Sequence, residues 1–274
     1  MPRINIYLDL RRLKKMKNWI KKELEDYKLL FRAIPSTVVA FFVLSVVCMN
    51  LLANKLLLDP SVTGKFFGGF TLDCGFTISW ISFLCMDMVC KRFGPRAATK
   101  LSIFAVAVNL FVTVGFWLLM KTPGLWWPAY LEDGSTDLAI NQSLNSVFAG
   151  SWAIVAGSAL AMLLSSVVNA ILNHTIGKAI RDDNVTFGKF AIRSFISTGV
   201  AQWVDNLVFV LALGVLLYSN IPEYFSAANL IINPLIGMGF ELLCEVVFSP
   251  IGFKVSKGWA KDGVGQDYLN NRKV

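Results

Sequence analysis

Six long apolar segments occupy most of this 274-residue chain and constrain its fold more than any other feature. They lie at roughly 36–57, 70–90, 98–120, 151–176, 193–218 and 228–252. Each is long enough to cross about 30 Å of hydrocarbon, which takes about 20 helical residues. Only 16% of the residues are charged, against about 25% in ordinary soluble domains. The sequence therefore predicts an all-α integral membrane protein, with six transmembrane helices forming one domain over residues 35–254.

The basic residues fall on one side of this predicted membrane. All 26 Lys and Arg residues except Lys55, Lys65 and Lys121 lie in the two terminal segments or in the turns and helix ends at 91–100 and 177–193. Because cytoplasmic segments are enriched in Lys and Arg, we expect both termini in the cytoplasm and the protein in the inner (plasma) membrane. The net charge of +8 does not indicate nucleic-acid binding, since the cations flank the spans instead of lining a groove with aromatic residues.

The two ends of the chain differ in character from the six segments. Within residues 1–34, apolar side chains between Leu8 and Phe31 recur every three or four positions among many lysines, a pattern typical of an amphipathic helix. We expect this helix to lie on the inner leaflet, held there by anionic lipid and by the side chain of Trp19. A docking surface for another protein is the alternative. Residues 255–274 are expected to form a cytoplasmic tail.

One carboxylate interrupts the second apolar segment, in the stretch TISWISFLCMDMVCKRFGPRAATK that begins at Thr77. Asp87 would cost about 2.5 kcal/mol or more at the centre of a membrane helix, so an acid there indicates a functional site facing the bundle interior. The structural alternative is an ion pair with Lys91, four residues later on the same helix face.

Further acids and amides lie in the fifth and sixth segments. Gln202, Asp205 and Asn206 fall within about one helical turn and must face other helices or a cavity. Glu241 and Glu245 are four residues apart on one helix face. Because two ionised carboxylates this close repel each other, this pair is a candidate for proton coupling. Structural hydrogen-bond networks or contacts between helices are the alternatives for both groups.

The first and second segments add amides and aromatic rings. Asn50 and Asn54 share one face of the first segment, while Trp80 and Phe83 lie in the second. Carboxylates, amides and flat apolar rings together suit a small planar ligand that forms hydrogen bonds, such as a nucleobase or a vitamin.

Motifs of soluble enzymes are absent from the sequence. It contains no phosphate-binding P-loop, no HExxH and no GxSxG. Its five cysteines include no CxxC pair, so we expect neither a metal site nor a disulfide. We expect a protein that is not an enzyme, needs no cofactor and has no ATPase activity of its own.

Four motifs in order resemble the VUT family of six-helix proteins, also called queuosine precursor transporters. FLCMDMVCKRFGPRAA has the family's Asp followed by aromatic–Gly, through Asp87, Phe93 and Gly94. MNLLANK resembles its first-helix Asn motif, and FAIRSFISTGVAQWVDNLVF its Arg–Ser–amide–Asp motif. FSPIGFKV resembles its closing Pro segment. The resemblance covers roughly residues 45–254. It departs at Trp80 and Glu241, where the family often has Pro and Lys.

The resemblance implies uptake of a deazaguanine precursor of queuosine across the inner membrane. On this hypothesis Asp205 and Asp87 accept hydrogen bonds from the ring, while Gln202, Asn50, Asn54 and Asn206 orient it. Trp80 or Phe83 stacks on the ring, and Glu241 or Glu245 couples a proton.

Two other classes of function remain open from the sequence. The chain could be the vitamin-binding subunit of an energy-coupling-factor transporter, which would require a separate ATPase module. It could instead be a membrane scaffold that binds partners through residues 1–34. A homodimer is compatible with the small residues of the fourth segment.

Overall fold

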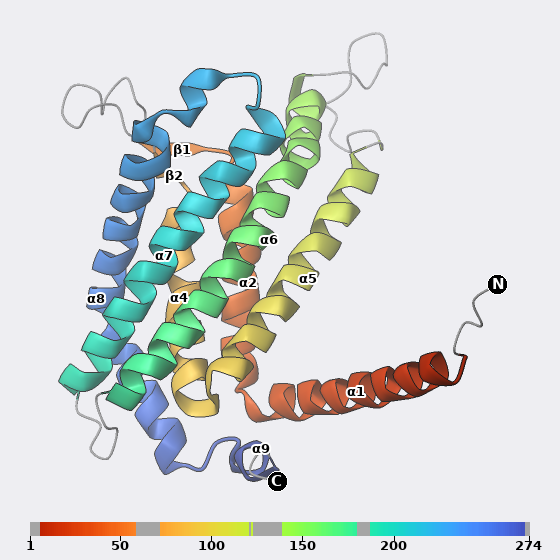
Figure 1. Cartoon of the computed structure of the whole chain (residues 1–274). Coiled ribbons are helices and arrows are strands. Elements are labelled where there is room, and N and C mark those ends of the chain that lie inside the picture. The colour runs from red at the N-terminus through yellow and green to blue at the C-terminus, as the bar shows by residue number, and fades with distance from the viewer. Residues whose placement is uncertain (1–5, 59–71, 121, 123–138, 180–186, 272–274) are drawn as a thin grey trace.

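The computed structural model describes residues 6–58, 72–120, 122, 139–179 and 187–271, and within these ranges six long helices run side by side as one bundle (Figure 1). They are α2 (Ser36–Leu52), α4 (Phe76–Phe93), α5 (Pro95–Leu119), α6 (Ala139–Ala179), α7 (Phe187–Leu217) and α8 (Asn233–Lys261). A long helix, α1 (Ile6–Ala33), and a short one, α9 (Gln266–Asn271), lie at one end of the bundle. We call this the α1 end.

The opposite end of the bundle holds a two-stranded antiparallel ribbon, and we call it the ribbon end. Strand β1 (Leu56–Leu58) pairs with β2 (Leu72–Asp73), with Leu56 opposite Asp73. The connection from α7 to α8 lies at the same end and contains the 3₁₀ turn η2 (Pro222–Phe225) and the π-helical turn η3 (Ala228–Ile232).

Several of these helices are long and apolar enough to cross a membrane. In the described part of the chain they are α5, residues 145–178 of α6, residues 195–217 of α7, and the continuous segment Ala228–Lys261 formed by η3 and α8. Helices α1 and α2, joined through a bend of 105°, can supply a fifth span. The prediction of an all-α membrane protein is thus confirmed, with four to five candidate spans among the described residues. Helices α2 and α4 are not candidate spans by themselves, because α2 has only 17 residues and α4 contains three charged residues.

Two predicted segments were too long at the ribbon end. Helix α2 ends at Leu52, and the apolar residues that follow include strand β1. Helix α4 begins at Phe76, after the residues of strand β2. Hydropathy alone does not distinguish a short apolar strand from the last turn of a helix, which explains the error.

Helix α4 lies in the centre of the bundle. It packs against α2, α5 and α8, and every residue from Ser82 to Cys90 is buried. Because protein surrounds this helix, its polar side chains face other helices instead of lipid. This position explains why the second segment can be the least hydrophobic of the six.

A tight turn joins α4 to α5 at the α1 end. Gly94 alone separates the two helices and has a φ of 88°, in the left-handed region that glycine adopts without steric cost. Pro95 then begins α5, where its fixed φ favours the first helical turn. The sequence RFGPR therefore dictates an antiparallel α4–α5 pair.

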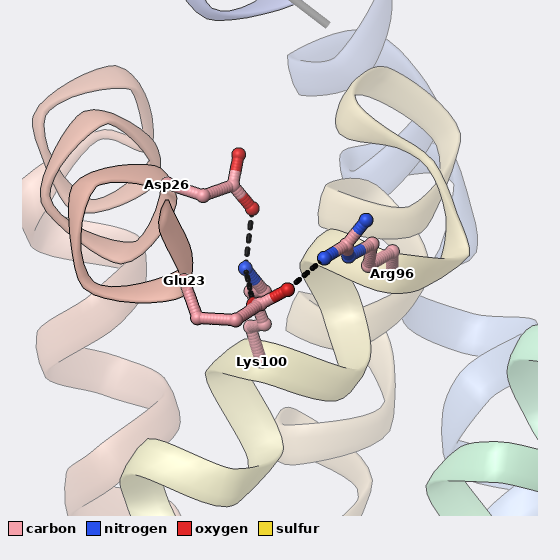
Figure 2. A network of polar contacts seen from close by, with 4 residues as sticks. All are labelled: Glu23, Asp26, Arg96 and Lys100. Carbon is pink, nitrogen blue, oxygen red and sulfur yellow. Dashed lines mark hydrogen bonds and ion pairs between the residues drawn. The ribbon is translucent and has the colours of Figure 1, made fainter. Parts of the chain in front are cut away.

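Ion pairs between α1 and α5 hold α1 across this end (Figure 2). Lys100 Nζ lies 2.6 Å from Glu23 Oε2 and also pairs with Asp26, while Arg96 pairs with the other oxygen of Glu23. The Lys100 side chain is only 6% exposed, so its charge requires these carboxylates. The hydrogen bond from Lys100 lowers the pKa of Glu23 below its ordinary 4.5. The ion pairs of Glu23 therefore keep their stabilising effect at neutral pH and lose it as the pH falls below 4.5 and through the lowered pKa.

The chain after residue 255 also packs onto the α1 end. Helix α8 continues to Lys261, and Arg92 Nε donates a hydrogen bond to the carbonyl oxygen of Val264 at 3.0 Å. The ring of Phe93 contacts those of Trp259 and Tyr268, and Tyr268 is buried. The cytoplasmic location of residues 255–274 stays a prediction.

Replacing Gly75 tests the contact between α2 and the start of α4. A Cβ at this position would lie 2.4 Å from the carbonyl oxygen of Met49. The φ of −64° suits any residue, so the conflict is purely steric. We expect Gly75→Ala to lower the free energy of unfolding by about 1–3 kcal/mol, measured by thermal denaturation in detergent. Gly239→Ala is the control, since no atom lies within 4 Å of its added Cβ. Equal melting temperatures for the two variants would contradict the described packing.

Candidate functional site

Three carboxylates, among them Asp73 of β2, and two amides line one small cavity inside the bundle. The cavity measures about 60 Å³, and Asn50, Asp205, Asn206 and Glu241 all line it. They come from three helices, α2, α7 and α8. We call it the acidic cavity. It brings together four of the residues that the sequence singled out.

Hydroxyl and amide donors hold two of the acids of the acidic cavity, Asp205 and Glu241. Asp205 accepts a hydrogen bond from Ser165 Oγ of α6 at 2.6 Å. Glu241, which is 5% exposed, accepts hydrogen bonds from Ser79 of α4 and from Asn206 Nδ2, the latter at 3.4 Å. Asn206 fits against α8 because residue 237 is glycine. A Cβ at residue 237 would lie 3.0 Å from Asn206 Nδ2. Among the described residues, these partners are all uncharged.

Asp87 lies in a different polar cluster. It is 2% exposed and accepts hydrogen bonds from Asn169 Nδ2 of α6 at 3.2 Å and from Thr198 Oγ1 of α7 at 3.0 Å. This carboxylate therefore joins three helices. Thr198 was not predicted from the sequence, although it lies four residues before Gln202 and seven before Asp205, on the same face of α7.

Gln202 does not line the acidic cavity and lies three residues before Asp205 on α7. The Gln202 side chain is fully buried, and neither its Nε2 nor its Oε1 has a hydrogen-bond partner among the described residues. An unsatisfied buried amide costs about 1–3 kcal/mol, which suggests that water or a ligand completes it. Phe83 lines a narrow cavity of about 20 Å³ that shares Met49, Ser79 and Asp205 with the acidic cavity.

Three other predicted residues do not line these cavities. Trp80 stacks on Phe248 with ring centroids 4.0 Å apart, and its Nε1 donates to the carbonyl oxygen of Thr77. Asn54 is exposed and donates to Ser151 Oγ at 3.2 Å. Glu245 is 1% exposed on α8, one turn beyond Glu241. Their predicted roles in binding or proton coupling stay predictions.

A larger cavity adjoins the acidic cavity on its ribbon side, and we call it the outer cavity. It measures about 340 Å³ and shares Ala53, Asp73, Asn206 and Phe209 with the acidic cavity. Most of its polar lining was not predicted from the sequence, because these residues lie in short connecting segments. They are Asp73, Tyr218, Tyr224, Asn229 and Asn233.

The three cavities form a series from the ribbon end to the middle of the bundle, because each shares lining residues with the next. Among the described residues, no group of three or more His, Cys, Asp or Glu side chains could hold a metal ion. What the site offers a ligand is carboxylate oxygens, amides and apolar rings.

The fold and this polar interior define a multi-pass α-helical membrane protein with an internal site of the kind found in transporters. The family model described as putative vitamin uptake transporter matches residues 73–255, and the chain belongs to this family. The resemblance inferred from the four motifs is thereby confirmed. The match begins at β2 and ends within α8, so α1 and α2 lie outside it. No curated protein and no solved structure matches the chain.

A double-mutant cycle tests the polar cluster around Asp87. Removing its carboxylate leaves two buried donors unsatisfied, while Thr198→Val removes one of those donors. We expect Asp87→Ala to lower the free energy of unfolding by about 2–4 kcal/mol. The coupling energy with Thr198→Val should be at least about 1 kcal/mol, measured by thermal denaturation in detergent. Additive effects would contradict the contact. Thr113→Val is the control, because Thr113 Oγ1 donates its hydrogen bond within α5, to the carbonyl oxygen of Asn109. Its coupling energy with Asp87→Ala should be zero.

Proposed function

We propose that this protein imports a small planar heterocycle, a deazaguanine-type precursor of queuosine, across the inner membrane. The observation that supports this most is the acidic cavity, where Asp205, Glu241, Asn50 and Asn206 surround one space within a bundle of a transporter family. Carboxylates accept hydrogen bonds from ring N–H and amino groups, and amides can both donate and accept. This donor and acceptor set suits the edge of a guanine-like base.

In this proposal the predicted residues divide between two tasks. The substrate contacts Asp205, Asn206, Asn50 and Glu241. The buried amide of Gln202, which has no partner among the described residues, forms hydrogen bonds with substrate or water. Asp87 positions α4 against α6 and α7 through Asn169 and Thr198. Among the aromatic residues, Phe83 is nearer to the site than Trp80, whose face is already covered by Phe248.

The acidic cavity must enlarge during transport. Its volume of about 60 Å³ is well below the roughly 300–1,000 Å³ of typical ligand pockets. Helix movement that separates Ser79 from Glu241, or Ser165 from Asp205, would open it. Proton transfer to Glu241 or Glu245 is a suitable trigger, because protonation changes what these carboxylates accept and donate.

Six spans fit this proposal, with both termini in the cytoplasm. Helices α2 and α4 pack among the four apolar ones as central members of the same bundle. The α1 end then faces the cytoplasm, since Lys91 and Arg92 lie in the last turn of α4, and Arg96 and Lys100 of α5 pair with α1. The ribbon end faces outward.

The alternative is a vitamin-binding subunit that works with a separate ATPase module. The family description, which names vitamin uptake, keeps this class open. Purification of the protein together with a membrane coupling protein and two ATPases would favour it. Substrate uptake by the purified chain alone in liposomes would favour the first proposal.

Substitution of Asp205 tests the proposed substrate site. We expect Asp205→Asn and Asp205→Ala to reduce uptake of labelled 7-deazaguanine into proteoliposomes at least about tenfold, a loss of about 1.4 kcal/mol of interaction. Asp262→Asn also removes one carboxylate, but at an exposed position beyond α8, and should transport normally. Uptake by both Asp205 variants at the wild-type rate would show that this carboxylate does not contact the substrate.

We further propose that α1 lies on the inner surface of the membrane. The ion pairs with α5 hold α1 at 105° to α2, which sets it across the bundle axis. Its apolar side chains remain uncovered, with Leu13, Met16, Trp19 and Leu24 48–65% exposed. The helix also carries six lysines and three arginines against four acids. An anionic leaflet suits both features, because it accepts the apolar face and attracts the cations.

Fluorescent labels on two faces of α1 test this placement in nanodiscs of anionic lipid. In a variant lacking the native cysteines, a label at Ile20→Cys should be quenched strongly by brominated lipid, because this side chain belongs to the apolar face. A label at Lys22→Cys, about 200° further round the helix, should be quenched at least twofold less. Equal quenching at the two positions would contradict the placement.

A further inference from the structure

The outer cavity differs from the acidic cavity in size and in the elements that form it. Its volume of about 340 Å³ falls within the range of roughly 300–1,000 Å³ that is typical of ligand pockets. Its walls come from β2, α7, η2, η3 and α8. The cavity can therefore hold a bicyclic ligand in the conformation seen here, whereas the acidic cavity cannot.

Successive hydrogen bonds fix the wall formed by the α7–α8 connection. The hydroxyl of Tyr224 donates to the carbonyl oxygen of Val210 at 3.2 Å, and Asn229 Nδ2 donates to the carbonyl oxygen of Tyr224 at 3.1 Å. Asn233 Nδ2 in turn donates to Asn229 Oδ1 at 2.9 Å. Asn229 belongs to the π-helical turn η3, a distortion that occurs often at functional sites.

Flat aromatic surfaces belong to the same wall. Tyr218 and Tyr224 stack with ring centroids 4.6 Å apart and an interplanar angle of 23°. Residue 214 is glycine where Tyr224 packs against α7, and a Cβ there would lie 2.9 Å from Tyr224 Cε1. Phe209 adds another ring to the lining, so a planar ligand can contact aromatic residues on α7 and on η2.

The charge of the outer cavity is negative. Asp73 is the one charged side chain among the described residues that line it. One oxygen of Asp73 accepts a hydrogen bond from the backbone N–H of Gly75 at 2.7 Å. Burial raises the pKa of this carboxyl, and the hydrogen bonds from the backbone N–H groups of Gly75 and Phe76 lower it. An anionic ligand would be repelled here, whereas a ligand with an amino group would compensate Asp73.

We infer that the outer cavity is a separate substrate subsite, which binds uncharged or cationic planar heterocycles before they reach the acidic cavity and excludes anionic ones. This inference rests on the proposed function, because it takes the transported ligand to be a planar heterocycle. Asn206 connects the two subsites, since it lines both cavities and donates to Glu241. A ligand that leaves the outer cavity passes Asn206 and Asp73, which line both cavities, before it reaches Asp205 and Glu241, which do not line the outer cavity.

A charge series of one base tests the subsite. The probes are 7-deazaguanine and its 7-aminomethyl and 7-carboxy derivatives, which differ mainly in charge. Binding to the purified full-length protein is measured by calorimetry. Wild type should bind the uncharged and cationic bases and bind the carboxylate at least 100-fold more weakly. Asp73→Asn should weaken binding of the aminomethyl derivative about tenfold and binding of the uncharged base less than twofold. Glu223→Gln, an exposed carboxylate at the same end, should change neither.

A second pair of variants tests occupancy of the cavity without changing charge. Leu213→Trp places a large ring in the outer cavity, while Leu216→Trp places one on a surface that is 41% exposed. Only the first should abolish binding, with both proteins monodisperse by gel filtration. Wild-type affinity in Leu213→Trp, or preferred binding of the carboxylate, would overturn the subsite. If Asp205→Asn still abolished uptake, the proposed function would stand. Failure of wild type to bind any of the bases would overturn the proposed function itself.

Discussion

The arrangement of α4, α6 and α7 depends on the hydrogen bonds that the buried carboxylate of Asp87 accepts. An ionised or polar group at this depth is tolerated only when neighbouring protein groups satisfy it. Asn169 and Thr198 supply that satisfaction from two other helices. Helix α4 must therefore occupy the centre of the bundle, and its burial from Ser82 to Cys90 follows from this position. Lipid-facing surfaces are left to the more apolar helices around it.

The same requirement places the remaining polar groups along one side of α7. Thr198 contacts Asp87, Gln202 follows one turn later, and Asp205 and Asn206 reach the acidic cavity. Polar groups thus continue from a closed cluster near the α1 end to cavities that widen toward the ribbon end. In the proposed orientation this series of cavities is wide on the outer side and narrow on the inner side, as the proposed import requires.

Hydropathy and charge could predict much of this architecture, because both follow directly from the membrane environment. The helical class and the third to sixth segments were predicted from the sequence, as was the gathering of Asn50, Asp205, Asn206 and Glu241. What could not be predicted depends on contacts between distant residues. Trp80 stacks on Phe248, 168 positions away in the chain, and so leaves the cavity. The outer cavity was missed because Tyr224 and Asn229 lie in short turns whose geometry no periodic pattern reveals.

Ligand-dependent thermal stability of the detergent-purified protein tests the central claim most directly. The panel would contain 7-deazaguanine derivatives, guanine, riboflavin and biotin. A ligand that binds only the folded protein, at 100 times its dissociation constant, stabilises it by about 2.7 kcal/mol. We expect a clear rise in melting temperature with a deazaguanine and none with riboflavin or biotin. A rise with a vitamin alone would contradict the proposed function, and so would the absence of any rise with every compound in the panel.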